Sequence, residues 1–416
     1  MRRALIFVEP LRLCLGLLGQ TVLVGCSPSA ASTAEPSTAR SHVAPSSASS
    51  GGEIFDFPEV TSSPHELSAP RDLAPFLRLC KLGDGALSRL AERLARRQSE
   101  GQSALDSSEL GFALRAEGSP YVWPRTWTLE GEGLQSDATL ERMRAWLDSF
   151  GDGGERRCGV ALVNGGERSV LALVAVDALA DLEPVPVQRR AGSWVEVNAK
   201  LLVPASDAKL LVLGPNGAPH AVPTSFDGSR ARARFHADRP GAFLVQLLAS
   251  VAGGPRPVLE TTVYADVSPP SSFFADAAPG EPSSPLAPDA DRDAALFEMV
   301  NAARHSEQSP ALRRDPDLDA IAERHARAMH QLGRIAHDAG DGDPLARVEA
   351  AHLDVLITGE NVAHALNVTR AHRALWASPS HRENLLDPRF DRVGIGTVLD
   401  ADGSLWVCEV FADFVN

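Results

Sequence analysis

Two stretches rich in serine, proline and alanine divide this chain of 416 residues, and they limit its fold more than any other feature. Residues 26–70 and residues 268–291 show little periodic apolar pattern, so neither can build a hydrophobic core. The length also exceeds that of one ordinary domain. We therefore expect a multidomain chain, with residues 26–70 as a disordered tether and residues 268–291 as a linker.

Residues 1–25 have the features of a lipoprotein signal peptide. Arginines precede an apolar run at residues 13–24, which is too short to cross about 30 Å of hydrocarbon as a helix. The run ends in Leu23-Val24-Gly25-Cys26, which resembles the bacterial lipobox. That resemblance implies cleavage before Cys26, acylation of Cys26 and a membrane-anchored, exported protein. Ser27 implies the outer membrane or cell surface. An ordinary signal with a chance cysteine is the alternative.

Charge and cysteine content narrow the functional classes. The formal net charge of −14 argues against nucleic-acid binding, which needs a basic surface. Export would place the remaining cysteines in an oxidising compartment. Cys80 and Cys158 lie in one predicted module, so we expect a disulfide between them. Cys408 lies in an apolar strand pattern, which favours a buried, unreactive thiol.

Residues 71–183 are predicted to form an α+β module. Leu87, Leu90 and Leu94 recur at helical spacing. A second helix is expected at 138–150 and strands at 158–163 and 169–176. Arg157-Cys158-Gly159 echoes a later Arg392-Val393-Gly394, so one hypothesis is a degenerate copy of the C-terminal module. The other is an unrelated small α+β domain.

Residues 184–267 are predicted to form an immunoglobulin-like β-sandwich. Ala231, Ala233 and Phe235 alternate with arginines, which is the period of a half-exposed strand. Pro215-Asn216-Gly217 and Asp227-Gly228 supply turn chemistry between several short strands. Such modules mostly act as spacers or bind other proteins, and this one shows no catalytic arrangement of residues.

Residues 292–416 are predicted to combine helices with a closing hairpin. Helices are expected at 293–305, after Asp315-Pro316 and at 370–377, with Asp315 as a helix N-cap. Strands at 392–398 and 405–411 would be joined through Asp402-Gly403. The inner stripe of the second helix is expected to contain Leu318, Ile321, Ala322, His325, Met329 and Leu332.

Four short motifs occur in a fixed order in this last module. They are Ile335-Ala336-His337-Asp338, Gly359-Glu360-Asn361, the segment from Trp376 through Ser378-Pro379-Ser380-His381 to Asn384-Leu385, and Val393-Gly394-Ile395-Gly396. Together they resemble the bacterial branch of the CAP superfamily, which groups cysteine-rich secretory, antigen 5 and pathogenesis-related proteins. The resemblance covers roughly residues 291–416. It implies an α-β-α sandwich with a cleft.

The resemblance also implies which residues line that cleft. In the superfamily the cleft carries two histidines and two glutamates, and His337, Glu360 and His381 match three of them. The place of the other glutamate, three residues after the tryptophan, is Pro379 here. We therefore expect a three-residue cleft, with Asn361, Asn384 and Glu409 as secondary members.

The other histidines of this module are expected to be less important. His325 falls on the inner stripe of the second helix, where a satisfied core histidine is the favoured interpretation. His364 follows Glu360 by four residues and could approach the cleft. We expect four more to be solvated at helix ends or exposed positions: His305, His330, His352 and His372.

The three cleft residues allow more than one chemistry. Two imidazoles and a carboxylate can bind Zn²⁺ or another divalent metal, or form a proton-transfer network in which Glu360 raises a histidine pKa. They can equally hold the cleft together. The chain has no Gly-x-Ser-x-Gly and no His-Glu-x-x-His, so we do not expect catalytic residues.

These features lead to three functional hypotheses. The first is a surface-anchored protein that binds a lipid, a wall component or a protein partner in the cleft. The second is a metal-dependent hydrolase that uses His337, Glu360 and His381. The third is a structural envelope protein.

Overall fold

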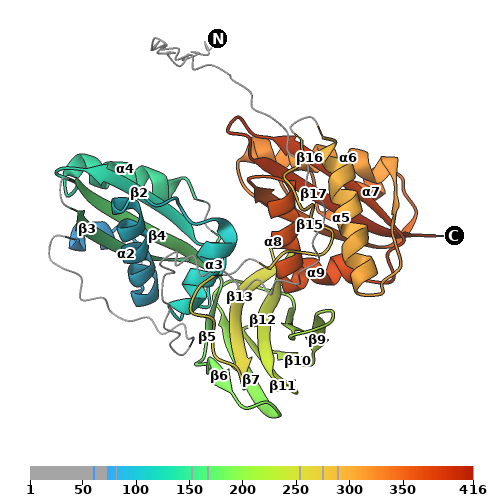
Figure 1. Cartoon of the computed structure of the whole chain (residues 1–416), viewed down its shortest axis with the longest axis horizontal. Coiled ribbons are helices and arrows are strands. Elements are labelled where there is room, and N and C mark those ends of the chain that lie inside the picture. The colour runs from blue at the N-terminus through green and yellow to red at the C-terminus, as the bar shows by residue number, and fades with distance from the viewer. Residues whose placement is uncertain are drawn as a thin grey trace, which may run out of the picture. The chain divides into compact units, whose positions relative to one another are not determined.

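The computed structural model describes Val60 and residues 73–80, 82–150, 153–165, 168–252, 254–273, 276–287 and 290–415. These residues belong to one compact unit, Gly51–Asn416 (Figure 1). The predicted signal peptide, the acylation site Cys26 and the predicted tether, apart from Val60, lie outside the described residues. Within the described ranges, no helix combines the length and apolar character needed to cross a membrane.

The first module is a four-stranded sheet in the order β1-β3-β4-β2. Helix α2 begins after Asp84, whose carboxylate accepts a hydrogen bond from the Leu87 amide. A disulfide joins Cys80 to Cys158, the predicted pair. The elements are α1 (Ala74–Leu77), β1 (Leu82–Gly83), α2 (Gly85–Ser99), α3 (Ser107–Ala116), β2 (Arg125–Gly131), α4 (Asp137–Asp148), β3 (Glu155–Gly165) and β4 (Arg168–Ala178).

The second module is a β-sandwich whose two sheets have the orders β10-β11-β7-β5 and β6-β13-β12-β8-β9. Its first strand, β5, pairs with β7, so the sandwich begins at Ala180 rather than at residue 184. The elements are β5 (Ala180–Leu182), β6 (Gln188–Arg189), β7 (Ser193–Leu201), β8 (Ala208–Leu213), β9 (His220–Val222), β10 (Thr224–Phe226), β11 (Arg230–Ala237), β12 (Gly241–Val251) and β13 (Gly254–Ala265).

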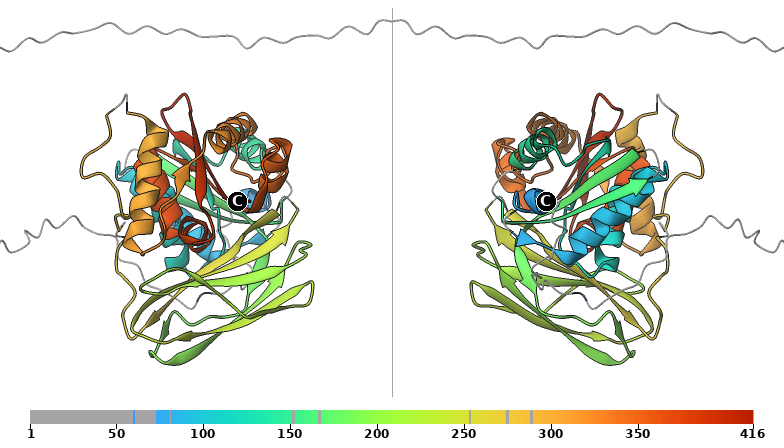
Figure 2. Two further views of the ribbon diagram at one scale, coloured as in Figure 1. Left: turned by 90° about the vertical axis from the view of Figure 1, so that its right-hand side faces the viewer. Right: turned by 90° about the vertical axis from the view of Figure 1, so that its left-hand side faces the viewer.

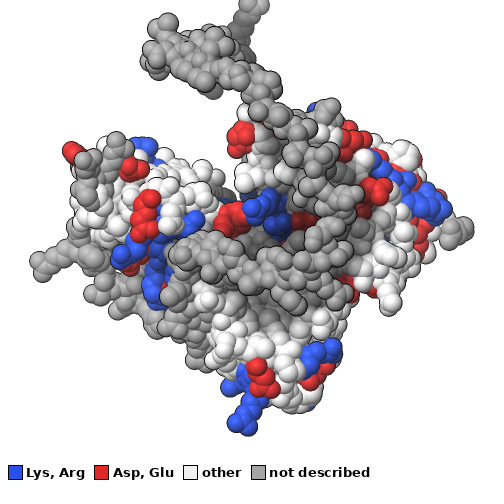
Figure 3. All heavy atoms as spheres, viewed as in Figure 1, with Lys and Arg blue, Asp and Glu red and all other residues white. Residues whose placement is uncertain are grey.

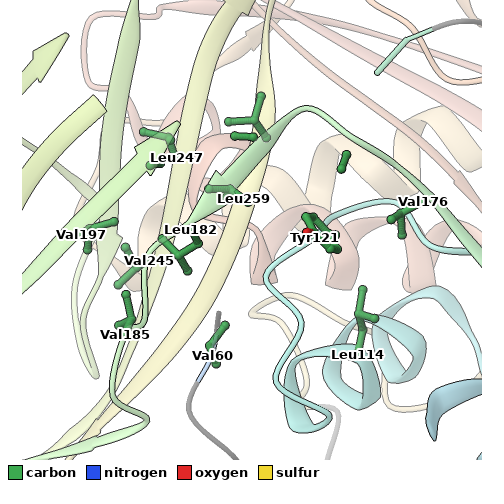
Figure 4. Close-up of a cluster of buried hydrophobic side chains, with 14 of the residues drawn as sticks. Val60, Leu114, Tyr121, Val176, Leu182, Val185, Val197, Val245, Leu247 and Leu259 are labelled. Carbon is green, nitrogen blue, oxygen red and sulfur yellow. The ribbon is translucent and has the colours of Figure 1, made fainter. Parts of the chain in front are cut away.

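One hydrophobic core joins the first module to the sandwich (Figure 4). Leu114 and Val176 contribute to it from the first module, and Val197, Val245 and Leu247 contribute from the sandwich. On β11 the arginines are exposed while Ala231 and Phe235 are buried, because successive side chains of a strand point to opposite faces.

The third module is a four-stranded sheet in the order β14-β16-β17-β15, with helices on both faces (Figure 2). Helices α6 and α7 pack on one face, and α5, α8 and α9 pack on the other. The elements are α5 (Arg292–Ser306), β14 (Arg313–Arg314), α6 (Pro316–Leu332), α7 (Pro344–Ala350), β15 (Val355–Ala365), α8 (Val368–Ala377), α9 (Pro379–Leu386), β16 (Arg392–Leu399) and β17 (Leu405–Phe414).

The first and third modules share a strand order. In each, a two-residue strand runs parallel to the first strand of a long hairpin, whose second strand pairs with an earlier strand. In each, a glycine lets a helix lie on the sheet. A Cβ on Gly159 would be 2.0 Å from the Leu87 carbonyl carbon, and one on Gly394 would be 2.0 Å from the Leu318 carbonyl carbon.

The segment at 268–291 contains no helix or strand in its described residues, yet parts of it pack on the third module. Glu281 forms an ion pair with Arg373 of α8. Gly280, with φ +84°, lies so close to α5 that a Cβ there would be 2.6 Å from the Ala302 Cβ. Ala278 is buried. Part of this predicted linker is therefore held against the third module.

Three local expectations in the third module were wrong. Leu332 is 41% exposed, because it ends α6 beyond the part that the sheet covers. His372 is fully buried rather than solvated, and its Nε2 hydrogen-bonds the Pro279 carbonyl. The segment after Ser378, where no helix was expected, is helix α9, with Pro379 at the first helical position.

Candidate functional site

Strand β15 places Glu360 and Asn361 at the edge of the third sheet. β15 is an outer strand that pairs with β17 alone, opposite Val410 at Glu360 and opposite Glu409 at Asn361. Because side chains alternate along a strand, these two neighbours point to opposite faces. Glu360 lies on the α6 and α7 side with Cys408, and Asn361 lies on the α9 side with Glu409.

The Glu360 carboxylate is buried and occupied by partners on both oxygens. Its side chain is 1% exposed. Oε1 lies 2.8 Å from His337 Nδ1, and Oε2 accepts a hydrogen bond from the Arg347 guanidinium. The Cys408 thiol lies 3.5 Å from Oε2. The guanidinium supplies the opposite charge that a buried carboxylate requires.

Contact with Glu360 fixes the orientation of His337. A carboxylate accepts hydrogen bonds, so Nδ1 of His337 carries the proton in this contact. In the neutral ring, Nε2 then presents a lone pair. The His337 side chain is 22% exposed and lines a cavity, so it is available to a ligand.

Arg347 ties the loop that carries His337 to Glu360. Its Nη2 donates to Glu360, and its Nη1 donates to the His337 carbonyl at 2.9 Å and to the Gly342 carbonyl. The helix that carries it, α7, begins after Asp343, whose carboxylate accepts a hydrogen bond from the Ala346 amide. Arg347 is 7% exposed and acts from inside the module.

His325 is a buried neighbour of this site. Its Nδ1 lies 2.9 Å from Asp341 Oδ2, its Nε2 lies 2.9 Å from the Ala336 carbonyl, and the same Nε2 is 3.7 Å from Glu360 Oε1. Burial would raise the pKa of Asp341, but the hydrogen bond and charge of His325, with Arg347, bring it below its ordinary value. His325 is thus the satisfied core histidine that helix periodicity predicts.

His381 reaches the same cavity from the other side of the sheet edge, on α9. The residue keeps partial exposure, yet surrounding protein atoms remove most water from the ring. This desolvation, with a smaller effect of nearby His337, holds the pKa of His381 well below its ordinary value. His381 is therefore neutral near pH 7.

Asn361, Asn384 and Glu409 join the sheet to α9. Asn361 Nδ2 donates to the His381 carbonyl and to Glu409 Oε2, both at 3.1 Å. Asn384 Nδ2 lies 3.0 Å from Asn361 Oδ1 and from the Glu360 carbonyl. Glu409 is fully buried, its Oε1 has no hydrogen-bond partner among the described residues, and burial raises its pKa to about 7.

A cavity of about 500 Å³ brings the three cleft residues together. It is lined by His337, Glu360, His381 and Asn384, whereas Asn361 and Glu409 lie behind it. Part of its lining comes from β8, β12 and β13 of the sandwich, including Lys209. This volume falls within the range of small-molecule sites.

Glu360 does not fit the role of a direct zinc ligand. The described residues include no group of three or more His, Cys, Asp or Glu side chains arranged to hold a metal. Both Glu360 oxygens already have protein donors, and the Arg347 charge would oppose a cation beside that carboxylate. The hydrogen bonds to both of its oxygens therefore do not support Glu360 as a metal ligand.

The sequence alone identified some of these residues and missed others. Arg347, Asp341 and the part that His325 plays beside Glu360 were missed. A buried carboxylate needs a cationic partner, so an arginine in a neighbouring helix could have been sought once Glu360 was assigned to the cleft. His364 lies elsewhere, stacked on Trp406 at 4.2 Å between ring centroids.

Comparison with known proteins identifies the class of the third module. Residues 297–410 match the CAP model, described as the cysteine-rich secretory protein family. The C-terminal module is therefore a CAP domain, and the resemblance read from its motifs is confirmed.

Individual relatives match only parts of the chain. "Uncharacterized protein YkwD" of Bacillus subtilis is 26% identical over 113 residues, 27% of this chain and 43% of its own length, so the match spans less than half of that relative. Among solved structures, an outer surface protein of Borrelia burgdorferi is 22% identical. The match covers 29% of this chain and 90% of the Borrelia chain, with a TM-score of 0.28. An extracellular SCP-domain protein of Bacillus anthracis is 16% identical. The match covers 56% of this chain and 86% of the Bacillus anthracis chain, with a TM-score of 0.27.

Proposed function

We propose that this chain is an exported CAP-domain protein that binds a lipid, a cell-wall component or a protein partner in the cleft of His337, Glu360 and His381. The orientation of His337 carries the proposal. Glu360 holds its Nδ1 at 2.8 Å, and the partly exposed ring lines the cavity, so the imidazole is fixed where a ligand could bind. His381, neutral near pH 7, offers a second imidazole.

The same geometry disfavours nucleophilic catalysis. Thr358, which lines the cavity, donates its hydroxyl to the Phe411 carbonyl, and Ser380 Oγ lies 3.4 Å from Ser378 Oγ rather than beside a cleft histidine. Burial raises the pKa of the Cys408 thiol well above its ordinary value, so its reactive thiolate form is suppressed. A ligand-binding site is therefore better supported than a hydrolytic active site.

The proposed location is the outer membrane or cell surface, with a lipid on Cys26. Its support is the lipobox resemblance of Leu23-Val24-Gly25-Cys26 and the tether composition that follows.

We further propose that the first module is a degenerate copy of the CAP domain. The shared strand order and the paired glycines support it. Following the strand registers from Gly394 and Gly159, Thr126 takes the place of Glu360, Trp127 that of Asn361 and Leu173 that of Glu409. Such a copy would keep the fold and lack the cleft chemistry.

The sandwich is proposed to be immunoglobulin-like and to act as a spacer or a protein-binding module. Two facing, mostly antiparallel sheets with alternating burial support that architecture.

Ligand extraction tests the binding proposal. The full-length chain, purified from its own membrane, would be extracted with organic solvent and the extract analysed by mass spectrometry, beside His337→Ala and the exposed-site control His305→Ala. We expect a compound that co-purifies with the wild type and the control and is lost with His337→Ala. A cleft that yields no compound and binds nothing on lipid, glycan and envelope-protein panels contradicts the proposal.

A further inference from the structure

The cavity beside the CAP cleft has a second wall that the CAP domain does not supply. Lys209 and Leu248 line it from β8 and β12 of the sandwich, and Pro257 lines it from β13. They line the same cavity as the cleft residues described above. A ligand held by His337 and His381 would therefore touch two modules.

Two polar contacts fix this wall to α9, the helix that carries His381. Lys209 Nζ lies 2.8 and 2.9 Å from the two carboxylate oxygens of Glu383. The amide N–H of Ser380 donates to Gln246 Oε1 at 3.1 Å. Ser380 directly precedes His381, so the Gln246 contact holds the backbone at the cleft histidine itself.

Gln246 is built into the sandwich as a rigid support. Its residue is 1% exposed, and its Nε2 donates to Glu260 Oε2 at 2.9 Å. The other oxygen of Glu260 accepts from the Arg115 guanidinium on α3. Buried amides with both ends bonded have one orientation, so Gln246 transmits the position of the sandwich to α9.

We propose that the cleft is a composite site, closed on one side by the sandwich, with Gln246 as the positioning residue for His381 and the Lys209–Glu383 pair as the contact that closes its rim. The identity of the ligand rests on the proposed binding function, but the wall itself does not. In such a site both modules limit the shape of the ligand.

The charges around the cavity indicate the class of ligand. Asp207 and Asp343 line it and are exposed, and Glu383 is paired with Lys209. The Glu360 charge is matched by Arg347. The lining therefore carries a surplus of carboxylates, which favours a small neutral or cationic ligand over an anionic one. On the face visible in Figure 3, positive and negative side chains are interspersed.

Acylation of histidine by diethylpyrocarbonate tests the composite wall without knowledge of the ligand. Rates at His337 and His381 would be measured by peptide mapping of the full-length chain, with exposed His305 as the internal reference. Lys209→Ala should raise the two cleft rates by about two- to fivefold, the range of one partly exposed ion pair. Gln246→Ala, which loses two hydrogen bonds, should raise the His381 rate by about tenfold.

Lys200→Ala is the matched control, because Lys200 is exposed on β7, outside the cavity lining. Rates equal to the wild type in both Lys209→Ala and Gln246→Ala overturn the composite wall, whatever the extraction experiment finds. Lys209→Ala keeps the test valid if Gln246→Ala fails to fold. Tetramethylammonium should slow the reaction at the cleft histidines more than sulfate does, and the reverse order contradicts the ligand class.

Discussion

Arg347 donates a hydrogen bond to Glu360 from inside the CAP domain, and both side chains are nearly excluded from solvent. This pair makes Glu360 a structural anion that orients His337. A carboxylate with a bound guanidinium is a poor metal ligand but a firm support. That contact supports the proposal that the cleft binds its ligand through hydrogen bonds.

Removing Arg347 should destabilise the protein far more than removing an exposed arginine. Arg347→Met leaves the buried Glu360 charge without its partner, which typically costs about 3–5 kcal/mol of unfolding free energy. Arg347→Met combined with Glu360→Gln should recover most of that loss. Urea unfolding of the wild type, the single variant and the double variant measures these free energies. Arg327→Met, which removes an exposed ion pair, is the control. A double variant as unstable as the single one would contradict the charge argument.

Glu409 should make stability depend on pH in a direction opposite to that of a salt-bridged carboxylate. Its pKa is raised from 4.5 to about 7 by burial, so its contribution is complete below pH 4.5 and is lost as the pH rises through 7. Relative to wild type, Glu409→Gln should gain up to about 3 kcal/mol between pH 4.5 and pH 8. Unfolding curves across that range measure it.

The Glu409 effect can be isolated from that of His381. The lowered pKa of His381 makes stability change with pH in the opposite direction. Its stability contribution is present above pH 6.5, the ordinary pKa of histidine, and is lost as the pH falls below that value. Wild type and Glu409→Gln both retain His381, so the difference between their unfolding free energies cancels the His381 contribution. A difference between Glu409→Gln and wild type that stays flat across this pH range would contradict the raised pKa of Glu409.

Gly394 and Gly159 should be equally intolerant of a side chain. Each lies against the backbone of a helix, so alanine at either position must displace that helix, at a cost of about 1–3 kcal/mol or more. Gly153→Ala, where a Cβ meets nothing within 4 Å, should be nearly neutral. Thermal unfolding measures all three variants. Tolerance of alanine at Gly159 alone would contradict a shared packing of the two modules.

Cys26→Ala should release the protein from the membrane. A lipid on Cys26 places the protein in the detergent phase of a Triton X-114 separation, whereas the variant should remain in the aqueous phase or stay unprocessed. Cys408→Ala is the matched control, because Cys408 is buried in the sheet. Detergent partitioning that is unchanged in Cys26→Ala would remove the anchor from the proposal.

Local patterns in the sequence predicted much of the CAP domain. Asp315 caps α6 as expected, because an aspartate before Pro316 provides both an acceptor and a preformed first turn. The hairpin of β16 and β17 is where alternation and Asp402-Gly403 placed it. His337 and Glu360 do meet, although nothing in their spacing of 23 residues required it.

The parts that could not be predicted depend on packing between distant segments. Alternation could not assign a face to Glu409; its pairing opposite Asn361 does, and it places Glu409 behind the cavity. Arg347 resembles any helical arginine until the burial of Glu360 is known. The approach of Gln246 to Ser380 joins two modules, and no local pattern carries that information.

Native mass spectrometry of the intact chain, purified from its own membrane without chelator, tests the central claim most directly. We predict an organic mass increment that survives in His305→Ala and is lost in His337→Ala, with no stoichiometric divalent metal in any of the three proteins. A stoichiometric metal that is retained by the wild type and lost with His337→Ala, without an organic ligand, would contradict this prediction.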